Sequence, residues 1–278
     1  MQTKENLRIS ILGCGWYGFE LGKMLVQKGH VLKGSTTSVN KLDLFKQANI
    51  TPYLLNFTDA YIPEYADFFE SDILIIALPP TKITTKENSY EKWIDTVAKL
   101  ASGAKVKHVL FISSTSVYAD NNSVIDESTS PDPITASGKS ILAAEKVLQQ
   151  EYAFTTTVIR FAGLVGPGRE PGKFFAGKQQ IPNGKAPVNL IHLLDCIGIT
   201  IGIIEKHAFN VTYNACSPHH PEKQHFYTLA TLKMGLTAPD FIDELINWKE
   251  ISSNRVDEML AYEWKTPNWD NWLKVKKN

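Results

Sequence analysis

Residues 8–22 read R-I-S-I-L-G-C-G-W-Y-G-F-E-L-G, and this stretch decides the fold of the 278-residue chain. A short run rich in β-branched residues stops at Gly13, Gly15 and Gly18 and continues into a helical pattern. The first glycine permits a tight turn, the second lets the main chain approach a pyrophosphate, and the third lets the helix lie close to the strand. The positive end of the helix then faces the anion. The predicted contact residues of this dinucleotide-binding turn are Gly13, Gly15, Trp16, Tyr17 and Gly18.

The surroundings of the three glycines strengthen this prediction. A strand precedes them, and a helix predicted over 16–28 ends at Gly29, which suits the left-handed residue that often follows a helix. The alternative is an ordinary corner between a strand and a helix, because glycines with this spacing also arise by chance. The order of strand, glycine turn and helix favours nucleotide binding over that alternative.

Composition and charge exclude several function classes. Hydrophobic residues make up 43% of the chain and charged residues 21%, which is typical of a globular protein. The 29 Lys and Arg residues balance 29 Asp and Glu residues, so no overall field attracts nucleic acid or an anionic membrane. We therefore expect a small-molecule substrate as the partner, and a phosphate site that is local.

Apolar runs and cysteines indicate the compartment. The run 9–12 is too short for a signal peptide, and the run 197–204 is too short to span a membrane. The odd set Cys14, Cys196 and Cys216 favours reduced thiols over a disulfide framework. These features predict a cytoplasmic protein. The histidines near Cys216 lack the paired spacing of a zinc site, so we predict no bound metal.

Short strand-like runs alternate with helical patterns, which predicts parallel strands joined by crossover helices. We expect strands at residues 7–12, 31–36, 50–55, 73–77, 108–113, 156–161 and 210–213. Further helices are expected at 39–48, 90–101, 135–151 and 190–206. The predicted fold class is α/β, a doubly wound parallel sheet of the Rossmann type. A glycine- and proline-rich loop at 166–173 marks departure from the sheet. We expect an NAD(P)-binding domain at 1–165 and 188–216, and a small substrate-binding domain at 166–187 and 217–278.

The second predicted strand ends in hydroxyl side chains rather than in an acid. About twenty residues past the glycine turn, where an acid would bind the ribose of NAD, the chain has Ser35, Thr36, Thr37 and Ser38. Their hydroxyls can donate hydrogen bonds to the extra phosphate of NADP, with Lys41 one helical turn away. This favours NADP, although no arginine is present to bind the phosphate through two hydrogen bonds and Ser38 can equally cap the next helix. NAD is the alternative.

Other predicted cofactor contacts lie where strands end, because open α/β sheets bind ligands at the carboxyl ends of their strands. Asn56 follows the third strand and is expected to meet the adenine. The residues after the fourth strand that are expected to line the ribose are Ala77, Leu78 and Pro79. The remaining predicted contacts, with the nicotinamide near 161–164, are Ser113, Phe161 and Leu164.

Six segments, taken in order, are typical of one family. They read H-V-L-F-I-S-S-T-S-V-Y (108–118), D-E (126–127), P-D-P (131–133), S-G-K-S-I-L-A-A-E (137–145), I-R-F-A-G-L-V-G-P-G-R (159–169) and I-H-L-L-D (191–195). Over nearly its whole length the chain resembles the extended short-chain dehydrogenase/reductases, the NAD(P)-dependent epimerase/dehydratase group. The resemblance implies a nucleotide sugar or another hydroxylated small molecule as substrate. It also implies that Thr115 polarises a substrate carbonyl or hydroxyl.

The Tyr-x-x-x-Lys pair that moves the proton in that family is missing at the matching positions. Ser137 stands at the tyrosine position and Ile141 at the lysine position. A phenol with a pKa of about 10 becomes a usable acid only when a neighbouring ammonium lowers that pKa, so losing the lysine removes the tuning as well as the partner. The chain is therefore similar to the atypical branch of the family, which keeps the cofactor turn but departs from the usual active-site residues.

Two further residues are predicted to contact the substrate. Tyr118 lies three residues beyond Thr115, with packing inside the loop as the alternative. Arg169 follows a Gly-Pro-Gly sequence, and its guanidinium suits a phosphate or carboxylate of the substrate; the alternative is a solvated loop arginine. Arg160, at the end of the sixth strand, is expected to anchor packing between helix and sheet.

Two function classes follow. In the first, the protein is an NADP-linked oxidoreductase or epimerase of atypical active site, with Thr115 polarising the substrate. In the second, it binds the cofactor without turnover and acts as a sensor or regulatory protein. The missing Tyr-Lys pair favours the second class and the retained Thr115 favours the first, which we prefer.

Overall fold

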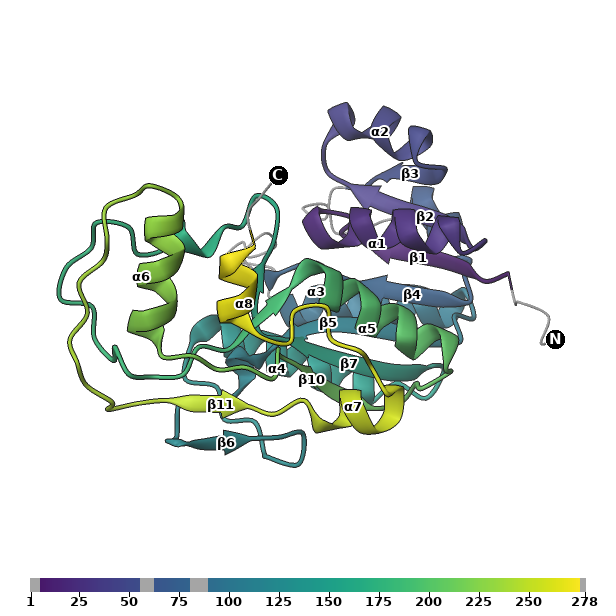
Figure 1. Ribbon diagram of the computed structural model, residues 1–278. Helices are drawn as coiled ribbons and strands as arrows, with labels where there is room; N and C mark the ends of the chain where they lie inside the picture. The colour runs from purple at the N-terminus through teal and green to yellow at the C-terminus, as the bar shows by residue number, and fades with distance from the viewer. Residues whose placement is uncertain (1–5, 56–62, 81–89, 276–278) are drawn as a thin grey trace. The chain divides into compact units, whose positions relative to one another are not determined.

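A seven-stranded sheet forms the centre of the computed structural model, which describes residues 6–55, 63–80 and 90–275 (Figure 1). The strand order is β10-β7-β5-β4-β1-β2-β3, and β1 pairs in parallel with both β2 and β4. The strands are β1 (Arg8–Leu12), β2 (Val31–Thr36), β3 (Ile50–Leu54), β4 (Ile73–Ile76), β5 (His108–Ser114), β7 (Thr155–Phe161) and β10 (Thr212–Ala215). All seven predicted strands are present with ends that differ by at most two residues, and the predicted doubly wound α/β fold is confirmed.

Burial explains why β1 and β4 form the middle of the sheet. All four residues of β4 are buried, and so are four of the five residues of β1. A parallel strand that is covered on both faces needs such a continuous apolar run, because neither of its faces meets water. The turn that follows β1 therefore starts from a rigid and fully packed strand.

Helices connect the strands, as the alternating pattern predicts. They are α1 (Trp16–Gln27), α2 (Leu42–Gln47) after the 3-10 turn η1 (Val39–Lys41), α3 (Tyr90–Gly103), α4 (Ala136–Gln149) and α5 (Leu193–Glu205). The Thr135 hydroxyl caps α4 by accepting a hydrogen bond from the Gly138 amide (3.0 Å). An ion pair between Lys28 and Glu205 (2.7 Å) joins the ends of α1 and α5. Within the described ranges, no helix is long and apolar enough to cross a membrane.

One helix begins later than predicted. The first residues of the helix expected over 190–206 form a short strand, β9 (Leu190–His192), which pairs in parallel with β8 (Gly163–Val165). Leu190 and Ile191 are buried in this pair. The helix prediction followed their apolar character, which a buried strand of this length supplies equally well.

Contacts within the chain group it into two compact units. The first unit comprises Met1–Val117, Pro133–Ile159 and Ile203–Thr212, and the second comprises Tyr118–Asp132, Arg160–Gly202 and Tyr213–Asn278. The predicted domains, 1–165 with 188–216 and 166–187 with 217–278, divide the chain elsewhere. They follow the order of the elements, whereas the contacts group the last residues of β7 and β10 with the second unit.

The second unit has its own core and its own short strands. Its elements include β6 (Ser123–Ile125), the 3-10 turn η5 (Pro171–Lys173), α6 (Lys223–Lys233), β11 (Lys249–Ile251), α7 (Asn254–Leu260) and α8 (Trp269–Lys274). A core cluster brings together Val165, Val188, Leu190, Phe226, Ala230, Trp269 and Leu273. Apolar side chains of α6 and α8 thus pack on Val165 of β8 and on Leu190 of β9.

A buried carboxylate holds the C-terminal part of the second unit. Asp195, in the first turn of α5, is 0% exposed and accepts hydrogen bonds from the Tyr262 hydroxyl (3.0 Å) and from the amides of Lys265 (2.6 Å) and Thr266 (3.1 Å). A charged acceptor strengthens each of these bonds. The Ser217 hydroxyl donates to the carbonyl of Thr266 and fixes the same segment.

We expect Asp195→Asn to destabilise the protein by about 2–3 kcal/mol, because the new amide places donors against two backbone amides and a hydroxyl that need an acceptor. Urea unfolding measures the loss. The control is Asp43→Asn, whose side chain is 85% exposed and which should change the free energy of unfolding by less than about 0.5 kcal/mol. Equal stability of the two variants would contradict the anchoring role of Asp195.

Candidate functional site

The glycine turn lies where the strand order of the sheet reverses. From β1 the chain builds outward through β2 and β3 on one side, and it then returns to place β4 on the other side of β1. Ligands of open α/β sheets bind at such a reversal, outside the carboxyl ends of the strands. Gly13 directly follows the end of β1, and Ala77 directly follows the end of β4. Because β1 and β4 are paired in parallel, these two predicted cofactor-binding segments lie next to each other in the first unit.

Two glycines of the turn are required by the protein itself. Gly13 has a φ of +86°, and a Cβ there would lie 2.5 Å from the Cγ of Leu78. A Cβ at Gly18 would lie 3.0 Å from a methyl carbon of Ile11 and 3.1 Å from the carbonyl oxygen of Gly13. The first glycine therefore permits the turn, and the third permits close packing of α1 on β1.

Gly15 differs from these two glycines, because packing does not require it. Its φ of −90° lies outside the left-handed region, and among the described residues a Cβ there would meet nothing nearer than the carbonyl oxygen of Gly13 at 3.9 Å. The space beside Gly15 is open, and the residue is exposed. A glycine that packing does not demand is explained by a ligand that approaches the main chain.

Backbone hydrogen bonds fix the shape of the turn. The Gly13 amide donates to the hydroxyl of Ser35 (2.8 Å), the Cys14 amide donates to the carbonyl of Ser35 (2.9 Å), and the Gly15 amide donates to the carbonyl of Gly13 (2.7 Å). Helix α1 starts directly afterwards, and its first turn holds no acidic side chain. The N-terminal amides of a helix lack carbonyl partners within the helix, so this end of α1 suits an anion.

The hydroxyl side chains at the end of β2, which were predicted to bind the cofactor, include both buried and exposed residues. Ser35 is 1% exposed and shapes the turn through Gly13. Thr36 is half-buried and accepts from the Ser38 amide (3.1 Å), whereas Thr37 is exposed. Thr36 and Thr37 thus lie at the carboxyl end of β2, where they are more accessible than the buried Ser35.

A basic side chain acts on the glycine turn. Burial raises the pKa of the Cys14 thiol to about 12, and the positive charge of Lys41 opposes part of that rise. Lys41 is exposed and ends η1. The role of Lys41 toward a phosphate stays a prediction.

The segment after β4 lies against the turn. The Ala77 amide donates to the carbonyl of Leu12 (2.8 Å), and Leu78 packs on Gly13 while its carbonyl accepts from the hydroxyl of the buried Tyr90 (2.7 Å). Pro79 is exposed. The structure thus brings two of the predicted ribose contacts beside the glycine turn. Asn56, predicted to meet the adenine, lies outside the described residues.

The end of β5 carries the residues that the family resemblance connects with chemistry. Thr115 begins the 3-10 turn η4 (Thr115–Val117), is 7% exposed, and makes no side-chain hydrogen bond within the described part of the chain. Its hydroxyl therefore has capacity for a ligand. A Cβ at Gly138 would lie 2.4 Å from the carbonyl oxygen of Ser116, so α4 packs closely on this turn. On α4, Ser137 is exposed and Ile141 is 8% exposed.

A buried pair between β5 and α4 escaped the sequence prediction. The Ser113 hydroxyl donates to the carboxylate of Glu145, and both side chains are buried. Glu145 lies four residues after Ile141 and three before Leu148, which are both buried on the same face of α4. An acid within an apolar helical stripe was the available signal. Ser113 was predicted to contact the cofactor. In the structure its hydroxyl contacts Glu145 inside the protein.

In the second unit, Tyr118 belongs to a buried polar network. Tyr118 is 2% exposed, and its hydroxyl accepts from the Arg160 guanidinium (2.5 Å) and donates to the side-chain oxygen of Asn214 (3.0 Å). The guanidinium carbon lies 5.0 Å from the centre of the Tyr118 ring. Burial raises the pKa of Tyr118, and the Arg160 charge opposes this rise. These contacts support the alternative interpretation that Tyr118 packs inside the protein. Arg160 holds the Tyr118 hydroxyl in place through its hydrogen bond.

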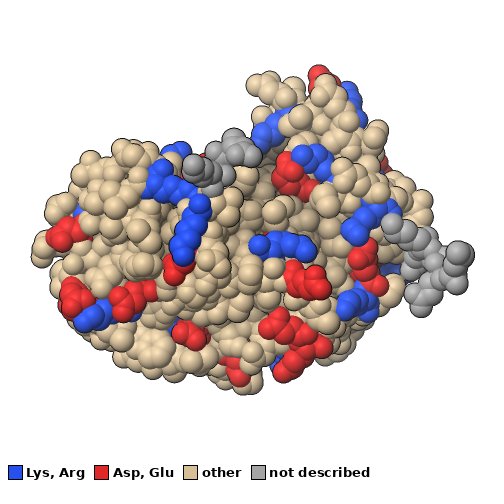
Figure 2. Space-filling model, viewed as in Figure 1, with Lys and Arg blue, Asp and Glu red and all other residues tan. Residues whose placement is uncertain are grey.

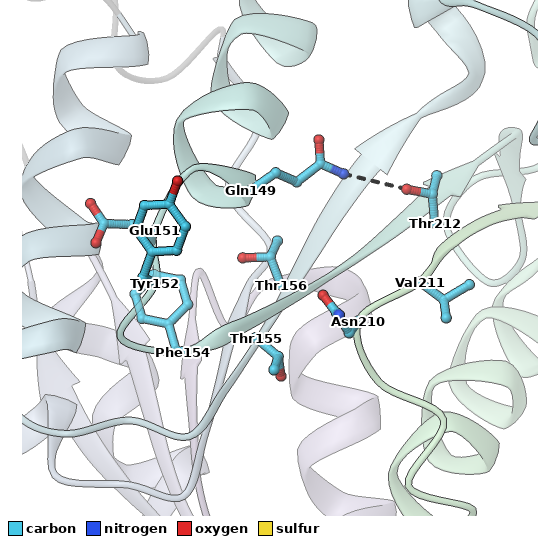
Figure 3. Close-up of a pocket in the computed structure, with 9 residues that line it drawn as sticks. All are labelled: Gln149, Glu151, Tyr152, Phe154, Thr155, Thr156, Asn210, Val211 and Thr212. Atoms are coloured by element: carbon cyan, nitrogen blue, oxygen red, sulfur yellow. Dashed lines mark hydrogen bonds between the residues drawn. The ribbon is translucent and has the colours of Figure 1, made fainter.

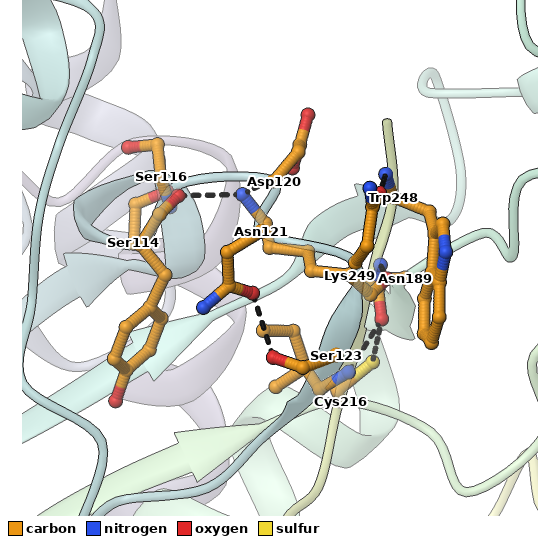
Figure 4. A network of polar contacts seen from close by, with 12 residues as sticks. Ser114, Ser116, Asp120, Asn121, Ser123, Asn189, Cys216, Trp248 and Lys249 are labelled. Carbon is orange, nitrogen blue, oxygen red and sulfur yellow. Dashed lines mark hydrogen bonds and ion pairs between the residues drawn. The ribbon is translucent and has the colours of Figure 1, made fainter. Parts of the chain in front are cut away.

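A second polar network of this unit fixes its C-terminal chain (Figure 4). The ammonium of Lys249, in β11, donates to the carbonyl of Tyr118 (2.7 Å) and forms an ion pair with Asp120 (2.9 Å). The Asn189 side chain donates to the carbonyl of Lys249 and accepts from the amide of Ile251, both at 2.8 Å. The parallel pair of β6 and β11 therefore rests on side chains that are far apart in the sequence.

The other predicted contacts of the second unit are dispersed. Phe161, which ends β7, is 3% exposed, and Leu164 is half-buried in β8. Arg169 is exposed on a tight turn, where its amide donates to the carbonyl of Gly166 (2.9 Å). The roles of Phe161 and Leu164 toward the nicotinamide and of Arg169 toward the substrate remain predictions.

Comparison with known proteins agrees with this arrangement. The model of the NAD dependent epimerase/dehydratase family matches residues 9–195. The chain belongs to this family. The sequence resemblance to an atypical short-chain dehydrogenase/reductase is thereby confirmed. Protein YeeZ from Escherichia coli (strain K12) is 32% identical over 266 residues, which cover 94% of this chain and 97% of YeeZ.

Solved structures of other proteins share the fold. UDP-glucuronic acid 4-epimerase from Bacillus cereus, solved in complex with NAD, superposes with a TM-score of 0.79 at 14% identity and covers 96% of this chain and 94% of its own. A functionally unknown conserved protein from Silicibacter pomeroyi DSS superposes with a TM-score of 0.77 at 21% identity, with 97% of both chains covered. At these identities the likeness concerns the fold alone.

We expect Tyr118→Phe to cost about 2 kcal/mol of stability, because Arg160 and Asn214 each lose a buried partner. Thermal unfolding compares this variant with Tyr152→Phe, whose parent side chain is fully exposed and whose change should be neutral. If Tyr118→Phe instead leaves stability unchanged and impairs substrate turnover, the substrate-binding prediction for Tyr118 holds and the packing role is wrong.

Proposed function

We propose that this member of the family binds a nicotinamide dinucleotide at the glycine turn and acts as an oxidoreductase or epimerase on a nucleotide sugar or another hydroxylated small molecule. The observation that carries the proposal is the open space beside Gly15, at the N-terminus of α1 and at the reversal of strand order. The Bacillus cereus epimerase, which shares the fold, was solved with UDP-glucuronic acid and NAD, and this supports the substrate class.

The residues of the first unit would hold the cofactor in separate roles. Gly15 admits the diphosphate to the main chain, and the N-terminal end of α1 favours its negative charge. Ala77 and Leu78 lie beside the turn at the position that the ribose would occupy, and the exposed Pro79 follows them. When bound, the nicotinamide supplies a carbon that accepts or donates a hydride. The residues of the chain would bind the cofactor, orient it, and polarise the substrate.

Three side chains support NADP over NAD. Thr36 ends β2 and Thr37 follows it, without a carboxylate that would repel the extra phosphate, and the exposed Lys41 lies at the end of η1. Ser35, included in the sequence prediction, contributes indirectly through its hydrogen bond to Gly13. Thermal melting with each dinucleotide ranks the two cofactors, and NADP should give the larger shift at equal concentration.

Gly15→Ala tests the binding site, because a methyl group there fills the space that the diphosphate needs while it clashes with no described residue. We expect the variant to stay folded without ligand. In the parent, NADP at about a hundred times its dissociation constant adds about 2.7 kcal/mol, and the variant should lose this gain. Gly103→Ala, at another position where a Cβ has open space, is the matched control and should keep it. A full shift in Gly15→Ala would refute the proposed site.

Thr115 is the residue that we assign to substrate polarisation. Its hydroxyl is open to a ligand at the carboxyl end of β5, close to the end of β4 in the same unit. Donation of a hydrogen bond from this hydroxyl would stabilise negative charge on a substrate oxygen. The exposed Ser137 lacks an activating lysine, so it does not replace the missing phenol.

A second function class rests on one observation. Ile141, at the position of the family's lysine, is packed into the apolar face of α4 and leaves no ammonium there to tune a proton donor. This favours the alternative of a cofactor-binding sensor or regulatory protein without turnover. Nicotinamide absorbance, followed with NADPH or NADP across a panel of nucleotide sugars, separates the two classes.

For the enzyme, we expect steady turnover that Thr115→Val lowers by at least about a hundredfold while the cofactor melting shift stays. Thr51→Val, an exposed threonine on β3, is the control. Binding without turnover in the parent would select the sensor instead.

Charge supports a small-molecule partner. On the face in Figure 2, basic and acidic side chains are interspersed. The whole chain carries equal numbers of both. A nucleic-acid partner would be matched by a basic patch on one face, and the visible face offers none.

A further inference from the structure

A pocket of the first unit lies beside the residues where β7 and β10 begin (Figure 3). The glycine turn, in contrast, follows the carboxyl end of β1. The pocket has a volume of about 460 Å³, within the range of small-molecule sites. It is formed where α4 ends and where β7 and β10 begin. The lining residues are Gln149, Glu151, Tyr152, Phe154, Thr155, Thr156, Asn210, Val211 and Thr212. The proposed dinucleotide site lies at the carboxyl ends of strands, whereas this pocket lies where β7 and β10 begin.

The polar lining of this pocket matches ligand hydroxyl groups. Two amides and three threonine hydroxyls contribute groups that both donate and accept hydrogen bonds, as a ligand hydroxyl does. The lining includes one carboxylate, from Glu151, and neither lysine nor arginine. A phosphate or carboxylate ligand would meet repulsion there and find no cation among the lining residues. The charge therefore favours a neutral ligand with several hydroxyls.

Some of these groups have hydrogen-bonding capacity to spare. The side-chain amide of Gln149 donates to the Thr212 hydroxyl (3.4 Å), which leaves its carbonyl oxygen for a ligand. The side chains of Asn210 and Tyr152 make no hydrogen bond within the described ranges, although the Asn210 amide of the main chain donates to Thr157. Figure 3 shows Tyr152 and Glu151 on one side of the pocket, and Thr212 and Val211 on the other.

The floor of the pocket is held rigidly. The Thr155 hydroxyl is hydrogen-bonded to the Nδ1 atom of His108 (2.7 Å), and the His108 ring stacks on Phe209 with 4.0 Å between centres. The Thr156 hydroxyl donates to the carbonyl of Leu148 (2.7 Å). A floor that is fixed before a ligand arrives lowers the cost of binding.

An aromatic ring at the rim completes the site. Tyr152 is fully exposed, so no described residue covers either face of its ring. The carbon-bound hydrogens of a sugar ring form an apolar face that can pack on such a ring, while the sugar hydroxyls reach Gln149 and Asn210. We propose that this pocket binds a neutral sugar, independently of the dinucleotide.

Saturation-transfer NMR on the full chain without dinucleotide tests this proposal. The probes are methyl glucoside as the neutral sugar, glucose 6-phosphate as its charged counterpart, and adenosine as a nucleobase carrier. We expect methyl glucoside to bind most tightly of the three. Tyr152→Ala and Gln149→Ala should each weaken it by at least about fivefold. Leu44→Ala, an exposed residue on α2, should leave it unchanged.

Three outcomes overturn the proposal: methyl glucoside fails to bind, its binding is insensitive to both pocket variants, or one of the other probes binds more tightly. Sugar binding in the Gly15→Ala variant separates this pocket from the proposed function. Binding retained there, together with loss in Tyr152→Ala, supports the pocket whatever the outcome of the cofactor experiments.

Discussion

The hydrogen bond from the Gly13 amide to the Ser35 hydroxyl is the contact on which the arrangement of the first unit depends. It connects the ends of β1 and β2, and it bends the chain so that α1 starts directly after β1. Leu78 closes the other side of the turn against Gly13. The ends of β1, β2 and β4 thus lie at one corner, and the main chain at Gly15 stays open to solvent.

Buried polar groups do the corresponding work elsewhere. Glu145 connects α4 with β5, Asp195 holds residues 262–266, and Arg160 holds Tyr118. Each of these charged groups is buried and meets hydrogen-bonding partners, because an unpaired charge in the interior would cost several kcal/mol. Apolar packing forms the two cores, and these few contacts determine which segments end beside one another.

The strands and most helices were predictable because their signals are local. Continuous runs such as 73–76, bounded by polar residues and turns, identify buried parallel strands directly. The role of Ser35 was not predictable, since a sequence shows a hydroxyl but not its partner, and successive residues of a strand face opposite sides. The strand β9 is too short for any periodic signal. The contacts of Glu145 and Asp195 join residues far apart in the chain, and no local pattern specifies such pairs.

The burial of Cys14 has a chemical consequence for the glycine turn. Burial raises the pKa of this thiol to about 12, so the thiol is protonated at neutral pH. Peroxides and alkylating reagents attack the thiolate, so they would modify this cysteine very slowly. A sulfur atom in the middle of the turn therefore does not expose it to oxidative damage.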